Sequence, residues 1–213
     1  MAVSNSRLRR KRPFGEIPGL RTLSLLFLAF LYLPIAVLVL YSFNAGNIVM
    51  VWTGFSTDWY TKAFANEDIR KAAMNSIIVA VSATAIATSC ATLAALALAR
   101  GGKFRGQGAT VGIITLPLMV PEIVTAVAML VFFSNIGLNF GLGNVILAHT
   151  TFCIPFAFMP IRARLEGMDT SLEQASRDLY ASDWETFRLI TLPLLMPGVL
   201  AGAMLAFVIS MDD

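Results

Sequence analysis

Long apolar runs alternate with polar segments along this chain of 213 residues. The apolar runs occupy residues 22–43, 75–99, 109–134, 144–161 and 192–213. A helix needs about 20 predominantly apolar residues to cross the roughly 30 Å hydrocarbon layer of a bilayer. The pattern therefore predicts an all-α, polytopic membrane helical bundle with one span in each run.

The third run contains two prolines, Pro117 and Pro121, which remove backbone donors and break or kink a helix. Glu122 follows directly. If the helix begins near Gly108, Glu122 lies about 14 residues and roughly 20 Å into the layer, at 1.5 Å per residue. If residues 109–116 lie at the interface instead, Glu122 is shallow and caps a helix that starts at Pro121. The sequence leaves both alternatives open.

One short motif occurs twice, as Thr-Leu-Pro-Leu-x-x-Pro at 115–121 and again at 191–197. Paired proline-interrupted spans point toward a transporter pathway. A Leu-Pro pair also suits an ordinary helix entry in lipid. The two interpretations carry equal weight.

Alanine recurs every four residues in the second run. Small residues at this spacing let helix backbones approach closely inside a bilayer, which predicts a packing seam. The seam consists of Ala83, Ala87, Ala91, Ala95 and Ala99.

Three residues with reactive or metal-binding side chains lie inside the apolar runs. Cys90 and Cys153 are interpreted as small buried hydrophobic residues. His149, the one histidine of the sequence, is predicted to face the bundle interior, because a metal site needs several ligands. We therefore expect neither a metal nor a cofactor.

The basic residues of the loops predict the orientation of the chain. Lys and Arg gather in residues 1–21, in the loop 100–108 and in the loop 162–191. The positive-inside rule therefore places the N-terminus and the 162–191 loop on the cytoplasmic side. The 44–71 connection is then external. Its aromatic side chains are expected to anchor it at the interface, or alternatively to help receive an external binding protein.

Composition excludes a soluble globular domain. The sequence is 57% hydrophobic and 14% charged, with a mean hydropathy of +0.73, whereas soluble domains contain about 25% charged residues. The net charge of +3 comes mostly from the N-terminal cluster, so it describes topology and not nucleic-acid binding. The glycine-rich 100–108 loop lacks the Gly-x-x-x-x-Gly-Lys-[Ser/Thr] order of a phosphate-binding loop, so any nucleotide must be bound by a partner.

One long polar insertion, residues 171–193, separates apolar runs in the second half of the chain. Two capping boxes, beginning at Ser171 and Ser182, predict two short helices in tandem. The break between them falls at Tyr180 and Ala181.

The first of these short helices is predicted to have a narrow docking face and a solvated back. On the back, Glu173 and Arg177 are spaced to pair at i, i+4. The docking face consists of Leu172, Ala175, Ser176 and Leu179.

The insertion resembles the EAA loop of membrane subunits of binding-protein-dependent ABC importers. The resemblance is carried by Glu-Gln-Ala-Ser-Arg-Asp-Leu-Tyr-Ala-Ser at 173–182, then Phe187, then Ile-Thr-Leu-Pro at 190–193. It implies that the short helices sit in a cleft of a cytoplasmic ATPase. The residues that it assigns to ATPase coupling are Glu173, Gln174, Ala175, Ser176, Asp178, Leu179, Tyr180, Ala181 and Ser182.

Two positions depart from the family pattern. The usual Glu-Ala-Ala becomes Gln-Ala-Ser at 174–176, and the usual turn glycine becomes Tyr180. A non-glycine residue in a left-handed turn costs roughly 1–2 kcal/mol, so either Tyr180 tolerates the strain or the turn is built differently. The competing interpretation is an amphipathic helix in the headgroup layer, which the mixed charge of the insertion disfavours.

For the whole chain, the resemblance implies a type I ABC importer permease (MetI-like) fold, with the permease core at 72–213. It implies a multi-pass subunit of the cell (inner) membrane that works with a second permease subunit, cytoplasmic ABC ATPase subunits and an extracytoplasmic solute-binding protein. Because the ATPases hydrolyse ATP, we do not expect the chain to be an enzyme. Family members usually have six spans, so we expect a chain truncated after the fifth.

Three acidic residues, Glu122, Asp212 and Asp213, adjoin long apolar stretches. The segments 121–125 and 210–213 resemble permeases of the spermidine and putrescine branch. A polycation that crosses a low-dielectric path needs carboxylates to replace its lost hydration. The hypothesis is that these three carboxylates face the pathway and contact substrate amines. The alternatives are a permease for another small solute, or a channel or scaffold subunit without an ATPase.

Overall fold

The computed structural model describes residues 19–48, 51–102 and 104–212. Within these ranges the regular structure is helical, apart from one isolated antiparallel bridge between Asn44 and Phe55. The predicted all-α class is therefore confirmed. The chain divides into two compact units, Met1–Arg70 and Lys71–Asp213.

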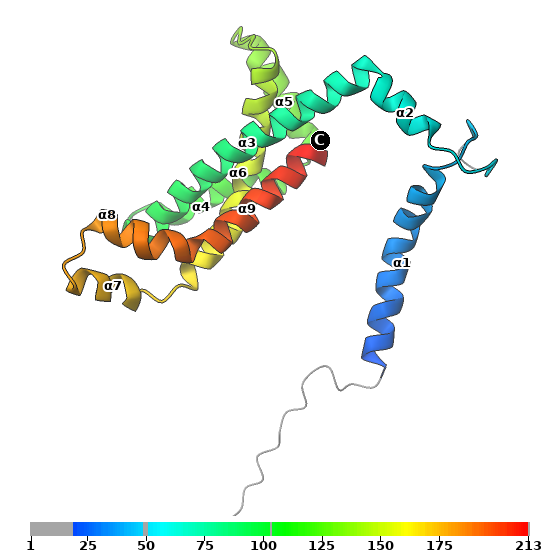
Figure 1. Ribbon diagram of the computed structural model, residues 1–213. Coiled ribbons are helices and arrows are strands. Elements are labelled where there is room, and N and C mark those ends of the chain that lie inside the picture. Colours follow the sequence, from blue (N-terminus) through cyan, green and yellow to red (C-terminus); the bar gives the residue numbers. More distant parts are fainter. Residues whose placement is uncertain (1–18, 49–50, 103, 213) are drawn as a thin grey trace, which may run out of the picture. The chain divides into compact units, whose positions relative to one another are not determined.

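The first unit contains the helix of the first apolar run. Helix α1, Leu20–Tyr41, is drawn in blue in Figure 1 and agrees with the span predicted at 22–43. It buries none of its residues. A helix that is apolar on all sides suits a lipid environment.

The connection after α1 is ordered around the side chain of Asn44. The Asn44 amide donates to the Val51 carbonyl at 2.7 Å, and its oxygen accepts the Thr53 N–H at 2.9 Å. A short helix, α2, follows at Asp58–Ala65. The connection therefore consists of a loop and one short helix.

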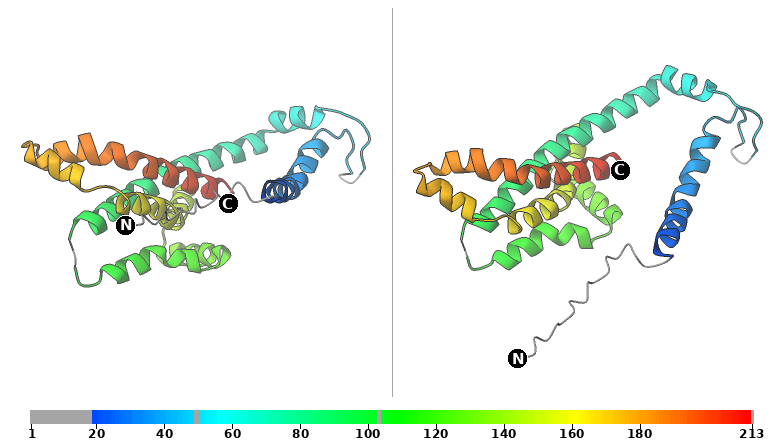
Figure 2. Two further views of the ribbon diagram at one scale, coloured as in Figure 1. Left: turned by 90° about the horizontal axis from the view of Figure 1, so that it is seen from below. Right: turned by 60° about the horizontal axis from the view of Figure 1, so that its bottom comes forward.

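The second unit is organised around three long helices: α3, Glu67–Arg100; α6, Leu142–Glu166; and α9, Leu192–Asp212. Helices α6 and α9 lie side by side in every view (Figures 1 and 2). All three contribute side chains to one buried cluster. The alanine seam of α3 belongs to this interface: Ala83, Ala87, Ala91 and Ala95 are buried, and Ala99 packs against the cluster.

Two glycines allow α9 to approach α6 closely. A Cβ atom on Gly198 would lie 2.6 Å from the Cβ of Arg164, and one on Gly202 would lie 2.7 Å from the backbone oxygen of Ala157. Both distances are too short for a side chain. The contact between α6 and α9 therefore depends on glycine at these two positions.

The third apolar run is broken, as its prolines predict. Helix α4, Gln107–Thr115, continues into the 3-10 helix η2, Leu116–Met119, and then the chain bends by 105° into α5, Glu122–Asn135. Val120, the residue before Pro121, is extended, as proline requires of its predecessor. Pro121 is the N-cap residue of α5, and Glu122 is the first residue of the helix, where the helix dipole favours an anion.

Within the described residues, four helices are long and apolar enough to cross a membrane, or five if the bent pair is one span. The count of five, with the bent pair α4–α5 taken as one span, equals the number of apolar runs in the sequence.

The polar insertion contains one separate short helix, not two. Helix α7, Ser171–Asp178, stands alone, whereas α8, Asp183–Thr186, continues through a π-helical turn, Phe187–Thr191, into α9. The predicted break at Tyr180 and Ala181 is confirmed, but the second helix is not short, because it continues into α9. Pro193 has no N–H to offer the carbonyl four residues earlier, and the wider π turn accommodates this defect without ending the helix.

The interpretation of the two cysteines is half right. Both are free thiols; Cys153 is buried in the core cluster, whereas Cys90 is exposed on α3. The apolar sequence around Cys90 cannot distinguish a helix face that packs against protein from one that faces outward.

Candidate functional sites

The segment α7–α8 lies at one end of the second unit, and the last described turn of α9 lies at the other end (Figure 2). The apolar side chains of the α7–α8 segment point outward. Leu172, Leu179 and Trp184 are 47%, 82% and 66% exposed, and Tyr180 is 98% exposed. Such a cluster of exposed large apolar side chains is typical of a docking surface.

Three of the four residues of the predicted docking face are exposed. Leu172, Ala175 and Leu179 are exposed, but Ser176 is half-buried against the rest of the unit. The Ser176 and Thr186 hydroxyls lie 3.0 Å apart and hydrogen-bond, which attaches α7 to α8.

The predicted pair between Glu173 and Arg177 is wrong, because α7 turns Glu173 inward. The Glu173 carboxylate accepts hydrogen bonds from Arg100 at the end of α3, the shortest being 2.9 Å from Nε, and from the Thr191 hydroxyl at 3.0 Å. Arg177 instead pairs with Asp183 at 3.1 Å. Spacing on a single helix could not reveal partners that come from other helices.

The two predicted capping boxes have different outcomes. The box of Ser182 and Glu185 is present, with the Ser182 N–H donating to Glu185 at 2.8 Å and the Glu185 N–H donating to the Ser182 hydroxyl at 3.3 Å. The box at Ser171 is wrong, since Ser171 is already helical. Its N–H donates to the Asp169 carboxylate at 2.9 Å, and this hydrogen bonding lowers the pKa of Asp169.

Tyr180 adopts the left-handed conformation that the family pattern reserves for glycine. Its φ is +62°, the one positive φ of a non-glycine residue among those described. The turn is therefore built in the usual way, and Tyr180 tolerates the strain. Its ring makes no compensating contact, because the residue is almost fully exposed.

Replacing Tyr180 with glycine is expected to stabilise the turn by about 1 kcal/mol, because glycine adopts positive φ without steric cost. Hydrogen exchange of the α7 amides in the purified protein measures this effect, and exchange should slow. Tyr180→Ala is the matched control, since alanine removes the ring but keeps the Cβ atom. Equal exchange in the two variants would contradict a strain-based explanation.

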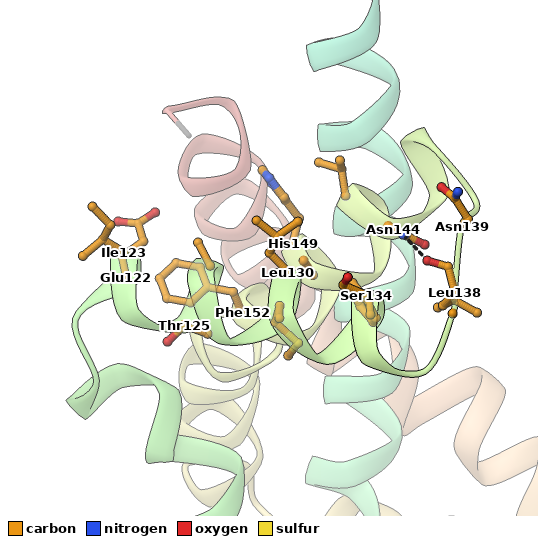
Figure 3. Close-up of a pocket in the computed structure, with 16 residues that line it drawn as sticks. Glu122, Ile123, Thr125, Leu130, Ser134, Leu138, Asn139, Asn144, His149 and Phe152 are labelled. Carbon is orange, nitrogen blue, oxygen red and sulfur yellow. Dashed lines mark hydrogen bonds between the residues drawn. The ribbon is translucent and has the colours of Figure 1, made fainter.

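A cavity of about 890 Å³ lies between α5 and α6. Figure 3 shows the Glu122 carboxylate at one end of it, the amides of Asn139 and Asn144 at the other, and His149 between them. The Asn144 amide donates to the Leu138 carbonyl at 2.8 Å and so orders the loop between the two helices. The wall combines apolar side chains with one carboxylate and a few neutral polar groups, which suits an amphipathic cation.

The other two predicted pathway residues are not brought to this cavity. Among the residues that the structure describes, Asp212 is exposed on the last turn of α9 and does not line the cavity. Asp213 lies outside the described residues. His149 does face the bundle as predicted, with its Nδ1 2.9 Å from the Ser210 hydroxyl of α9.

Several important residues were not predicted from the sequence. Gly198 and Gly202 have the Gly-x-x-x-Gly spacing of close helix packing, so this signal was present in the sequence. No sequence pattern indicated Arg100 or Thr191, because both are important through hydrogen bonds to Glu173, which lies on a different helix.

Residues 91–213, more than half of the chain, match the family model of the binding-protein-dependent transport system inner membrane component. The chain belongs to this family. As such a component it is a multi-pass inner membrane protein of a transport system, with a permease fold of the predicted type.

Individual relatives match this chain over most of its length. The chain is 41% identical over 185 residues to the spermidine/putrescine transport system permease protein PotC of Haemophilus influenzae. The matched stretch covers 87% of this chain and 72% of the relative. The same protein of Escherichia coli K12 is 40% identical over 87% of the chain and 70% of its own length. The putrescine transport system permease protein PotI of Escherichia coli K12 is 36% identical over 94% of the chain and 74% of its own length.

Proposed function

We propose that this chain is a membrane-spanning permease subunit of an ATP-driven importer and that it carries polyamines, spermidine or putrescine. The observation that carries the proposal is the identity of 36–41% with permeases of polyamine transport systems over most of the chain. The similarity covers 87–94% of the chain.

The proposed partners are cytoplasmic ABC ATPase subunits, a second permease subunit and an extracytoplasmic solute-binding protein. The exposed surface formed by Leu172, Leu179 and Trp184 supports docking to an ATPase, because these side chains lack cover at the end of the helical unit. In this arrangement the N-terminus and the 162–191 loop are cytoplasmic, as the distribution of basic residues favours.

The cavity between α5 and α6 is the proposed route of the substrate. Polyamines carry ammonium groups joined by methylene chains, so they need a carboxylate for the charge and apolar walls for the methylenes. Glu122 supplies the carboxylate in the cavity. Asp212, on the last turn of α9, and Asp213 are proposed to contact the substrate on another part of its route.

Uptake of labelled spermidine and putrescine tests this function. The chain is expressed with the ATPase, second permease and binding protein of its own transport system in cells that lack polyamine importers. We expect uptake that requires ATP and the binding protein. Uptake that continues without the ATPase would indicate a passive channel, and import of an unrelated solute in place of polyamines would refute the substrate.

Replacing Ala175 with arginine is expected to uncouple substrate from ATP hydrolysis, because a bulky charge would prevent the exposed face of α7 from seating in its partner. Substrate-stimulated ATP hydrolysis should fall by about tenfold, while the amount of protein in the membrane stays unchanged. Ala175→Ser, which adds little bulk, is the control. Stimulation at the level of the unaltered chain in Ala175→Arg would rule out docking through this face.

A further inference from the structure

We propose that Glu173 is a positioning residue that fastens α7 to the ends of two membrane helices, α3 and α9, so that a displacement of α7 reaches both helices together. This inference rests on the proposed function. It gives Glu173 a different task from the exposed residues around it, which face outward toward a partner.

The contacts of Glu173 join three elements at one carboxylate. Arg100 donates from Nε to both carboxylate oxygens, at 3.3 and 2.9 Å, and from Nη2 to Oε1 at 3.2 Å. The Thr191 hydroxyl donates to Oε1 at 3.0 Å. Several bonds from a planar guanidinium fix direction as well as distance, so this pair orients α7 and does not merely attract it.

The surroundings strengthen this ion pair. Arg100 lies in the last turn of α3 and Glu173 in the first turn of α7, where the helix dipoles favour a cation and an anion respectively. The Glu173 side chain is only 12% exposed and that of Arg100 is 29% exposed, so water screens the pair weakly. The pair between Arg177 and Asp183, with side chains 62% and 89% exposed, lacks this shielding.

Thr191 carries the connection into α9. It is buried and is the last residue of the π-helical turn that runs directly into α9. A π turn in an otherwise α-helical segment is a deviation that needs support from its surroundings. The hydroxyl of Thr191 in this turn donates a hydrogen bond to Glu173. A shift of α7 therefore acts on the start of α9 at the same time as on the end of α3.

The test compares spermidine imported per ATP hydrolysed by the complete importer in proteoliposomes with its binding protein. The ratio should fall by about tenfold in Glu173→Gln and in Arg100→Gln. The double variant should be no worse than either single variant, because both remove the same interaction. Exchanging the charges, Arg100→Glu with Glu173→Arg, should restore part of the ratio. Arg177→Gln with Asp183→Asn is the matched control and should keep it.

A second measurement does not depend on transport. Hydrogen exchange of the α7 amides in the purified chain should quicken in Glu173→Gln and stay unchanged in the Arg177 and Asp183 control. If Glu173→Gln retains both the import ratio and the slow exchange, the fastening role is overturned. If the unaltered importer carries no spermidine, the proposed function is refuted. If the α7 amides still exchange faster in Glu173→Gln than in the control, the role of Glu173 in attaching α7 is nevertheless supported.

Discussion

Replacing Gly202 with leucine is expected to force α6 and α9 apart and to destabilise the second unit by about 3 kcal/mol, the cost of overpacking a tight interface. The Cβ atom alone would stand 2.7 Å from the backbone oxygen of Ala157 and 3.2 Å from its Cα. Backbone atoms cannot turn aside as a side chain can, so the two helices must separate. The effect is large because α6 and α9 lie against each other and both contribute fully buried side chains to the core cluster, Phe158 from α6 and Leu195 from α9.

The midpoint of thermal unfolding in detergent, followed by circular dichroism, measures this loss. Gly112→Leu is the matched control, because Gly112 lies in helix α4 and a Cβ atom there would meet nothing within 4 Å. We expect the control to unfold near the midpoint of the unaltered protein. Equal midpoints for the two leucine variants would show that the glycine contact does not hold α6 against α9.

Replacing Glu122 with glutamine is expected to reduce polyamine uptake by about ten- to hundredfold. Hydrogen bonds to a charged group contribute about 1.5–3 kcal/mol, and each 1.4 kcal/mol is a factor of ten. The Glu122 carboxylate stands at one end of the cavity between α5 and α6, so a passing ammonium group would lose its counter-charge (Figure 3). Glu122→Asp keeps the charge and should retain part of the uptake.

Two further acidic residues provide comparisons, with uptake normalised to the amount of protein in the membrane. Glu166→Gln removes a carboxylate that lies at the end of α6 and pairs with Arg162 at 2.7 Å, so uptake should be unaffected. Asp212→Asn should have a smaller effect than Glu122→Gln, because Asp212 does not line the cavity in the described part of the chain. Undiminished uptake in Glu122→Gln would show that the Glu122 carboxylate does not contact the substrate.

The helices could be predicted from the sequence because each feature is local. A run of apolar residues sets the position of a helix, and the four-residue spacing of alanine sets the buried face of α3. The capping box at Ser182 is equally local. The family pattern, which reserves position 180 for glycine, raised the possibility of a strained turn at Tyr180 but left open whether a tyrosine would adopt it.

The repeated Thr-Leu-Pro-Leu-x-x-Pro motif shows where local prediction ends. Its first copy, at 115–121, leads into a bend of 105°, whereas its second copy, at 191–197, enters one continuous helix. The difference lies in packing. Helix α9 buries Leu195, Gly198 and Gly202, while α4, η2 and α5 bury no residue completely. Tertiary contact holds the second copy straight, and no seven-residue motif can encode that contact.

The partners of Glu173 could not be predicted for a related reason. The pairing expected with Arg177 uses the spacing of one helix, but Arg100 lies 73 positions away and Thr191 lies 18 positions away. The partly buried hydrogen bonds of Glu173 with Arg100 and Thr191 are more favourable than an exposed i, i+4 pair with Arg177, which would contribute only a few tenths of a kcal/mol.

The continuity of α8, the π turn and α9 has a mechanical consequence. Trp184 at the exposed end and Ser210 beside His149 stand on the same helix, Asp183–Asp212, with no loop between them. A helix of 30 residues is about 45 Å long at 1.5 Å per residue. We therefore expect a rotation of Trp184 about the helix axis to be transmitted through the π turn to the hydroxyl of Ser210, because no loop lies between them to absorb it.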